Sequence, residues 1–226
     1  MKISEAAREA GVTTATWKYY IREGLVPEGE RLGANRTEYG EAHVRRVRLV
    51  RALLDTGRLS ISSAREVLDA LDSHVDIRPA FEAAQHALDE GRPPGTAEST
   101  ARVEKLVTAQ GWLTTGRNPG VDAAARALDG FAATGQQPSD AYLAAYADAA
   151  RRLAQADLAA IAELAARDGS DSVVELMVVG TVMGDGLIAG LRRIAQEHES
   201  AHAAETTASG ATDSALPNSA SRKDTP

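Results

Sequence analysis

The run Gly91-Arg92-Pro93-Pro94-Gly95 constrains the fold more than any other feature, because it places two prolines and two glycines within five residues. Proline lacks a backbone donor and glycine weakens regular structure, so neither a helix nor a strand is expected to continue through it. The 226 residues suffice for one full domain and a smaller one. We therefore predict a domain boundary here, with a short helix and linker over residues 74–95.

Before this break, the sequence predicts two short helices joined by a tight turn. The first covers residues 4–10 and stops at Gly11, and the second carries Trp17, Tyr20 and Ile21 at helical spacing. Two helices joined in this way indicate a helix-turn-helix. Residues 27–40 contain four glycines or prolines and no helical period, which favours a loop or small hairpin, a candidate wing.

The remaining periodic segments all predict helices. They cover residues 41–55, 60–73, 75–90, 96–110, 119–133, 139–167 and 171–197. We therefore expect an all-α protein: a winged helix-turn-helix over 1–73 with a small β wing, then a helical domain over 96–197. Residues 198–226 lack periodicity and are expected to form a disordered tail. A helix-pairing seam is predicted from the stripe Tyr142, Tyr146, Ala149, Leu153, Ala156 and Ala160. The last helix contains several glycines, and we expect it to form an oligomer interface.

Charge is divided unevenly along the chain. The net charge is −7, but residues 1–60 carry +3 and residues 61–226 carry −10. A basic head on an acidic body favours nucleic-acid binding by the head, because phosphate contacts need only local cations. The absence of cysteine excludes disulfides, thiolate metal sites and cysteine nucleophiles. With no secretory signal pattern at the start, we expect a cytoplasmic protein.

The head contains a composite motif. Its parts are Ile3-Ser4-Glu5-Ala6-Ala7, Gly11-Val12-Thr13, Thr16-Trp17-Lys18-Tyr19-Tyr20, Glu23-Gly24-Leu25-Val26-Pro27 and Asn35-Arg36-Thr37-Glu38-Tyr39. In order and spacing this motif resembles the winged helix-turn-helix head of the bacterial mercury-resistance-regulator (MerR) family. The resemblance implies a transcriptional regulator that binds a palindromic operator in double-stranded DNA as a homodimer, with RNA polymerase a candidate partner at the promoter.

Six residues are the candidate DNA contacts. Thr13 and Thr14 place hydroxyl and free N–H groups at a helix start, where a phosphate or a base edge can be met. By resemblance the other contacts are Lys18, Tyr19, Arg36 and Tyr39. The family commonly has arginine where Lys18 stands, so bidentate base reading is lost there. Arg45, Arg46, Arg48 and Arg51 on the following helix form either a phosphate track or a solvated face.

The C-terminal helices contain a candidate effector pocket. Its residues are Trp112, Tyr142, Tyr146, Met177, Met183 and Asp185, for which ordinary core packing is the alternative. Such a pocket would take a small non-metal effector, because the family's metal-sensing branch uses cysteines that this chain lacks. The five histidines show no metal-ligand spacing, and we expect neither metal nor cofactor.

The sequence predicts no enzyme, because it has no Ser/His/Asp set, paired-carboxylate motif or phosphate-binding glycine loop. No membrane span is expected either, because Glu175 and Asp185 interrupt the most apolar segment. Two other functions stay open. One is a helical protein-interaction module, and the other is a small-molecule-binding protein whose DNA head only regulates its own gene. Activation and repression are equally compatible with the sequence.

Overall fold

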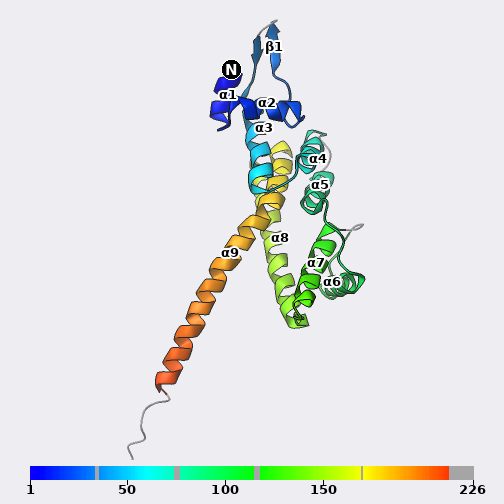
Figure 1. Cartoon of the computed structure of the whole chain (residues 1–226), viewed down its shortest axis with the longest axis vertical. Helices are drawn as coiled ribbons and strands as arrows, with labels where there is room; N and C mark the ends of the chain where they lie inside the picture. The colour runs from blue at the N-terminus through cyan, green and yellow to red at the C-terminus, as the bar shows by residue number, and fades with distance from the viewer. Residues whose placement is uncertain (34–35, 74–76, 115–117, 169, 214–226) are drawn as a thin grey trace, which may run out of the picture. The chain divides into compact units, whose positions relative to one another are not determined.

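The computed structural model is built from helices, with a two-stranded antiparallel hairpin near the N-terminus of the described chain (Figure 1). It describes residues 1–33, 36–73, 77–114, 118–168 and 170–213. The elements are α1 (Ile3–Glu9), α2 (Thr14–Arg22), β1 (Glu30–Gly33), β2 (Arg36–Glu38), α3 (Glu41–Arg51), η1 (Ala52–Thr56), α4 (Ile61–Asp72), α5 (Ile77–Asp89), α6 (Ala97–Ala109), α7 (Pro119–Ala133), α8 (Asp140–Asp168) and α9 (Ser170–Asp213). The predicted fold class, all-α with a small β wing, is confirmed.

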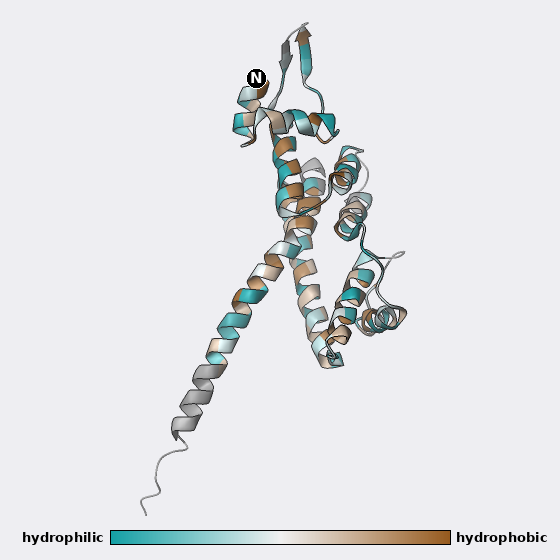
Figure 2. Ribbon diagram, in the orientation of Figure 1, coloured by the Kyte–Doolittle hydropathy of each residue, from teal (hydrophilic) through white to brown (hydrophobic). Residues whose placement is uncertain are grey.

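The first 73 residues form the expected helix-turn-helix and wing, which we call the head. Trp17 is fully buried and Tyr20 is 6% exposed, as their helical spacing predicts. Strands β1 and β2 pair with Glu30 opposite Glu38 and Arg31 opposite Thr37, which confirms the hairpin. Figure 2 shows hydrophobic residues along α3, whose Val47 is also fully buried.

The helix predicted over residues 41–55 changes its winding before it ends. It is α-helical to Arg51 and continues as η1, a π-helical turn over Ala52–Thr56. Such turns are rare inside α-helices and are frequent at functional sites. Leu53, within η1, is fully buried and belongs to the core of the head.

Helices α6, α7 and α8 form a second cluster around Val103, Ala125 and Leu128. The predicted boundary at Gly91–Gly95 does not separate this cluster from the head. The Arg126 guanidinium on α7 donates hydrogen bonds to the Asp89 carboxylate at the end of α5 and to the Pro93 carbonyl at 2.9 Å. Contacts place Met1–Gly184 in one compact unit, so the chain divides within α9 rather than at this linker.

Helix α9 is longer than the sequence pattern indicates. The predicted end at residue 197 is wrong, because α9 continues to Asp213. Residues 198–213 contain several alanines and no proline, a composition that sustains a helix without apolar periodicity. The disordered tail predicted from residue 198 is therefore corrected for 198–213, and residues 214–226 lie outside the described chain. No described helix is long and apolar enough to cross a membrane.

The seam predicted on α8 is uncovered in the described structure. Its residues, Tyr142, Tyr146, Ala149, Leu153, Ala156 and Ala160, are all exposed. Ala147, on another face of α8, is buried. The second unit, which begins at Asp185, also exposes apolar side chains, with Leu187 65% and Leu191 52% exposed.

Candidate nucleic-acid interface

The start of α2 is fixed by Thr13. Its Oγ1 accepts a hydrogen bond from the Thr16 amide at 3.0 Å and lies 2.8 Å from the Thr16 hydroxyl. A threonine in this position satisfies one of the free N–H groups at a helix start. Thr13 is exposed, and Thr14, the first helical residue, is half-buried. The N-terminus of α2 is therefore both capped and accessible.

Further along α2, one face of the helix is buried in the core and another is exposed to solvent. Trp17 and Tyr20 lie in the core, whereas Lys18 is exposed. Tyr19 is half-buried, and the Arg22 guanidinium lies 5.2 Å from its ring centroid. This cation–π contact keeps a cation beside the tyrosine on an accessible part of the helix.

The wing carries one predicted contact, and its base carries another. Arg36 begins β2, and its side chain lies outside the described part of the structure. Tyr39 is only 7% exposed, and its ring meets Trp17 edge-on at 5.3 Å and His43 at 5.4 Å between centroids. Burial and the nearby Glu28 raise the pKa of the Tyr39 hydroxyl. The structure thus gives Tyr39 a packing role, and its contact with DNA stays a prediction.

Backbone hydrogen bonds hold the wing base against the chain start. The Met1 amino group donates to the Tyr39 carbonyl at 2.9 Å, and the Tyr39 amide donates to the Met1 carbonyl at 3.0 Å. Together with the packing of Tyr39 on Trp17, these bonds tie β2 to α2. The wing and α2 are therefore positioned by one buried aromatic cluster.

The arginines of α3 bind the backbone of the helix-turn-helix. Arg48 donates to the Glu9 carbonyl at 2.8 Å, and Arg51 donates to the Gly11 carbonyl at 3.0 Å. Arg46 donates to the Leu25 carbonyl at 2.9 Å and pairs with Asp72. These guanidinium groups bind carbonyls at or shortly after the ends of α1 and α2, where helices leave acceptors without partners.

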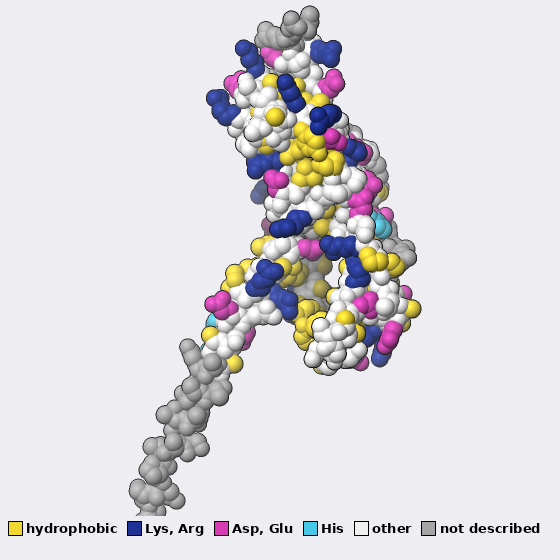
Figure 3. Space-filling model, in the orientation of Figure 1, with side chains coloured by type: hydrophobic (Ala, Val, Ile, Leu, Met, Phe, Trp, Pro, Cys, Tyr) yellow, Lys and Arg dark blue, Asp and Glu magenta, His cyan; other side chains and the backbone are white. Residues whose placement is uncertain are grey.

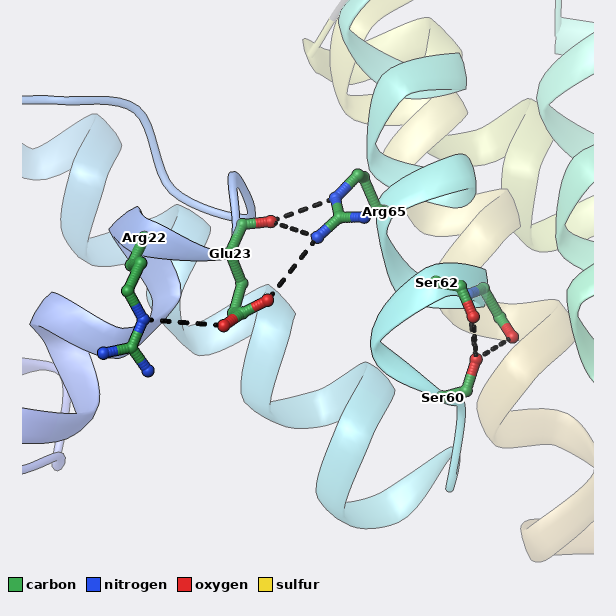
Figure 4. A network of polar contacts seen from close by, with 6 residues as sticks. Arg22, Glu23, Ser60, Ser62 and Arg65 are labelled. Atoms are coloured by element: carbon green, nitrogen blue, oxygen red, sulfur yellow. Dashed lines mark hydrogen bonds and ion pairs between the residues drawn. The ribbon is translucent and has the colours of Figure 1, made fainter.

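Arg65 makes a similar contact from α4 (Figure 4). Its guanidinium donates two hydrogen bonds to the Glu23 carbonyl, at 2.5 and 3.0 Å, and lies 3.8 Å from the Glu23 carboxylate, which also pairs with Arg22. The sequence left a phosphate track and a solvated face open for the α3 arginines. The structure keeps Arg48 exposed, and it adds backbone partners for Arg46, Arg48 and Arg51 that neither alternative included. Local sequence carries no signal for these contacts, because their partners lie 21–42 residues away.

The predicted effector residues lie in several places. Tyr142 and Tyr146 are together on α8, with ring centroids 4.6 Å apart and a 2.8 Å hydrogen bond between their hydroxyls. Trp112 is instead beside Arg151, whose guanidinium lies 5.9 Å from its ring centroid. Phe131, which sequence reasoning did not include, packs edge-on against Tyr142 at 6.4 Å.

The other three predicted residues lie on α9. Met177 is buried, and Met183 packs against the core of the head. Asp185 is exposed and belongs to the second unit. The pair Tyr142–Tyr146 is thus the part of the predicted pocket for which a direct contact between members is observed.

Lys and Arg side chains are spread over the face of the head seen in Figure 3, with acidic side chains between them. A helix-turn-helix with a free α2 N-terminus, an adjoining wing and surface cations defines a winged helix-turn-helix DNA-binding protein.

The comparisons with known proteins agree. The sequence profile of the MerR HTH family regulatory proteins matches residues 1–71. The chain is 33% identical over 108 residues to the mercuric resistance operon regulatory protein of Serratia marcescens, covering 48% of this chain and 72% of that protein. It is 30% identical over 88 residues to the HTH-type transcriptional regulator ZntR homolog of Haemophilus influenzae, covering 33% of this chain and 65% of the relative.

A solved structure extends the likeness beyond the head. SCO5550 of Streptomyces coelicolor A3(2), assigned as a transcriptional regulator, superposes with a TM-score of 0.65 at 30% identity, covering 89% of this chain and 97% of that one. The chain therefore belongs to the MerR family of transcriptional regulators. Proteins of this family are DNA-binding regulators and not enzymes.

Proposed function

We propose that the head binds operator DNA through the start of α2 and the wing, using Thr13, Thr14, Lys18, Tyr19 and Arg36. The observation that carries this proposal is the division of α2: its Trp17–Tyr20 side is buried, while Thr13 and Lys18 are exposed. A helix held rigidly from behind can present its N-terminal residues to a major groove, and a basic wing can reach phosphate or the minor groove. Tyr39, also predicted as a contact, would act chiefly by fixing the wing base.

The second part of the proposal is that a cytoplasmic homodimer occupies a palindromic operator. A two-fold dimer presents two heads to two half-sites separated by about one helical turn, roughly 10 base pairs, or a multiple of it. Support comes from the exposed apolar side chains Leu187, Leu191 and Ile194, which follow one another at four- and three-residue steps on α9. RNA polymerase at the promoter is the partner through which such a dimer would act.

The third part concerns control by a small non-metal effector bound to the C-terminal helices. Support comes from the exposed aromatic group Phe131, Tyr142 and Tyr146, which offers stacking surfaces and hydroxyl groups. The chain has no cysteine, so thiolate metal sensing is not available to it. A protein that binds a small molecule and only regulates its own gene shares this surface and differs in having a single target promoter.

Selection of binding sites from random duplexes with the full-length protein tests the proposal. We expect an enriched inverted repeat whose binding weakens with salt. On the selected site, Arg36→Ala should weaken binding to all sequences and lower the salt slope by about one, whereas Lys18→Ala should change preference at particular base pairs. Arg152→Ala, which removes an exposed arginine of α8 outside the head, is the matched control and should bind like the wild type. Equal losses on specific and random DNA for Lys18→Ala, or a loss confined to particular sequences for Arg36→Ala, would refute the assigned roles.

A further inference from the structure

The first half of α9 is part of the hydrophobic core of the head. Val178 is fully buried and Val182 is 3% exposed, and both belong to the same buried cluster as Trp17, Val50 and Leu53. Residues 178 and 182 are one helical turn apart, so they enter this core from one side of α9. The head of 73 residues predicted from the sequence therefore completes its core with side chains that lie over a hundred residues later in the chain.

Gly57 is the position that lets α9 approach so closely. A Cβ atom there would lie 2.2 Å from Val182 Cγ1 and 3.2 Å from Met183 Cε, and 2.8 Å from the Leu53 carbonyl oxygen. The shortest of these distances is far below a van der Waals contact. A side chain at residue 57 would therefore clash with α9 in its observed position. We call Leu53, Gly57, Val178, Val182 and Met183 the α9 seat.

The α9 seat is connected to the DNA-reading helices by consecutive contacts. Leu53 lies in the π-helical turn η1, and Gly57 follows it directly. The turn continues α3, whose Arg48 and Arg51 donate hydrogen bonds to the Glu9 and Gly11 carbonyls at the end of α1. A displacement at the α9 seat therefore acts on the same helix that holds the α1–α2 turn.

We propose that α9 is a built-in latch on the head: seated on Gly57, it holds α3 and, through the arginines of α3, the α1–α2 pair in the DNA-binding arrangement. An effector or partner that binds the protein more tightly with α9 unseated would then lower DNA affinity, because it shifts the equilibrium between the two arrangements. This inference rests on the proposed DNA-binding function, which it extends by assigning the element that regulates it.

The test compares two cavity-forming variants of the full-length protein. Val182→Ala removes two methyl groups at the α9 seat, and Val103→Ala removes the same atoms from the α6–α8 cluster, where Val103 is 7% exposed. Both variants should lower the melting temperature, because each leaves a cavity. Only Val182→Ala should weaken binding to the selected operator, by about tenfold. Amide hydrogen exchange in α1 and α2 should also rise in Val182→Ala and not in Val103→Ala.

DNA affinity and amide hydrogen exchange together distinguish a failure of the latch from a failure of the proposed DNA-binding function. If both variants bind DNA like the wild type and show the same protection of the α1 and α2 amides from exchange, the latch is refuted and the DNA-binding function stands. If the wild type binds no DNA, the proposed function fails, and hydrogen exchange still decides whether α9 stabilises α1–α2. Equal losses of affinity and protection in Val103→Ala and Val182→Ala would likewise overturn the inference, because they would reflect general destabilisation.

Discussion

At the residue scale, the arginines of the head differ in what their guanidinium groups contact. Arg46, Arg48 and Arg65 donate to backbone carbonyls at or shortly after the ends of α1 and α2, whereas Arg22 lies over the Tyr19 ring near the surface of α2. Arginine suits the first role, because its planar fork can satisfy a carbonyl and a carboxylate together. Several cations of the head therefore already have partners within the protein, and fewer are available to DNA than the positive charge of the head suggests.

Glu90 provides a pH-dependent contact at the same scale. Its carboxylate accepts hydrogen bonds from the hydroxyls of Ser60, Ser62 and Ser63, two of which are labelled in Figure 4 at the start of α4. The Ser63 hydroxyl first, and then those of Ser60 and Ser62, lower the pKa of this carboxyl group. A carboxyl whose pKa is lower in the folded state stabilises the fold above its unfolded pKa, and this stabilisation is lost as pH falls.

We predict that Glu90→Gln lowers the free energy of unfolding at neutral pH and that its difference from wild type shrinks on acidification below the ordinary glutamate range. Urea denaturation at several pH values measures this difference. Glu66→Gln, at an exposed glutamate of the same α4 helix, should follow the wild type throughout. A difference between Glu90→Gln and wild type that does not depend on pH would contradict the assigned cause.

At the element scale, each helix exists where the local pattern predicts it, but its surroundings set its ends and winding. Helix α7 covers Pro119–Ala133, the range that the sequence indicates, because Asn118 caps it and Pro119 suits a first turn. By contrast, α3 ends in the π-helical turn η1, which its apolar spacing does not indicate. Leu53 of this turn is buried in the core, and Leu54 packs against that core.

The linker between α5 and α6 gives a prediction at this scale. A Cβ atom on Gly95 would lie 2.4 Å from Ala125 Cβ, with the backbone of residues 125 and 126 at 3.0 and 3.1 Å. We expect Gly95→Ala to lower the free energy of unfolding by about 1–3 kcal/mol, because α7 cannot move away without breaking its own packing. Gly130→Ala, in α7 with open space around it, should instead raise it by up to about 1 kcal/mol. Urea denaturation of both variants checks the signs, and equal effects would contradict the close approach at Gly95.

At the scale of the whole molecule, α9 belongs to two units. Its first turns, to Gly184, complete the core of the head, and its continuation from Asp185 forms the second unit. Within that second unit, Leu187, Leu191 and Ile194 are 65%, 52% and 66% exposed. A long helix with an uncovered apolar stripe is typical of a segment that pairs with another helix.

If the second unit joins two copies, Leu191→Asp should convert the dimer to a monomer and weaken binding to a two-half-site operator more than to a single half-site. A buried charge at a helix-pairing position costs several kcal/mol, on the order of the stability of a short coiled coil. Light scattering after size exclusion measures the mass. Leu158→Asp, at a residue of α8 that is 64% exposed, is the matched control and should leave the mass unchanged. A dimer that survives Leu191→Asp would place the interface elsewhere.

The sequence by itself determined the features that depend on neighbours along the chain. Helical spacing located Trp17 and Tyr20 in the core, and the glycines and prolines of residues 27–40 located the wing. Only the tertiary structure decided which carbonyls the α3 arginines bind, that Tyr39 packs on Trp17, and that Val182 enters the head. These contacts join residues far apart in the chain, and apolar periodicity reports which face of a helix is covered without identifying what covers it.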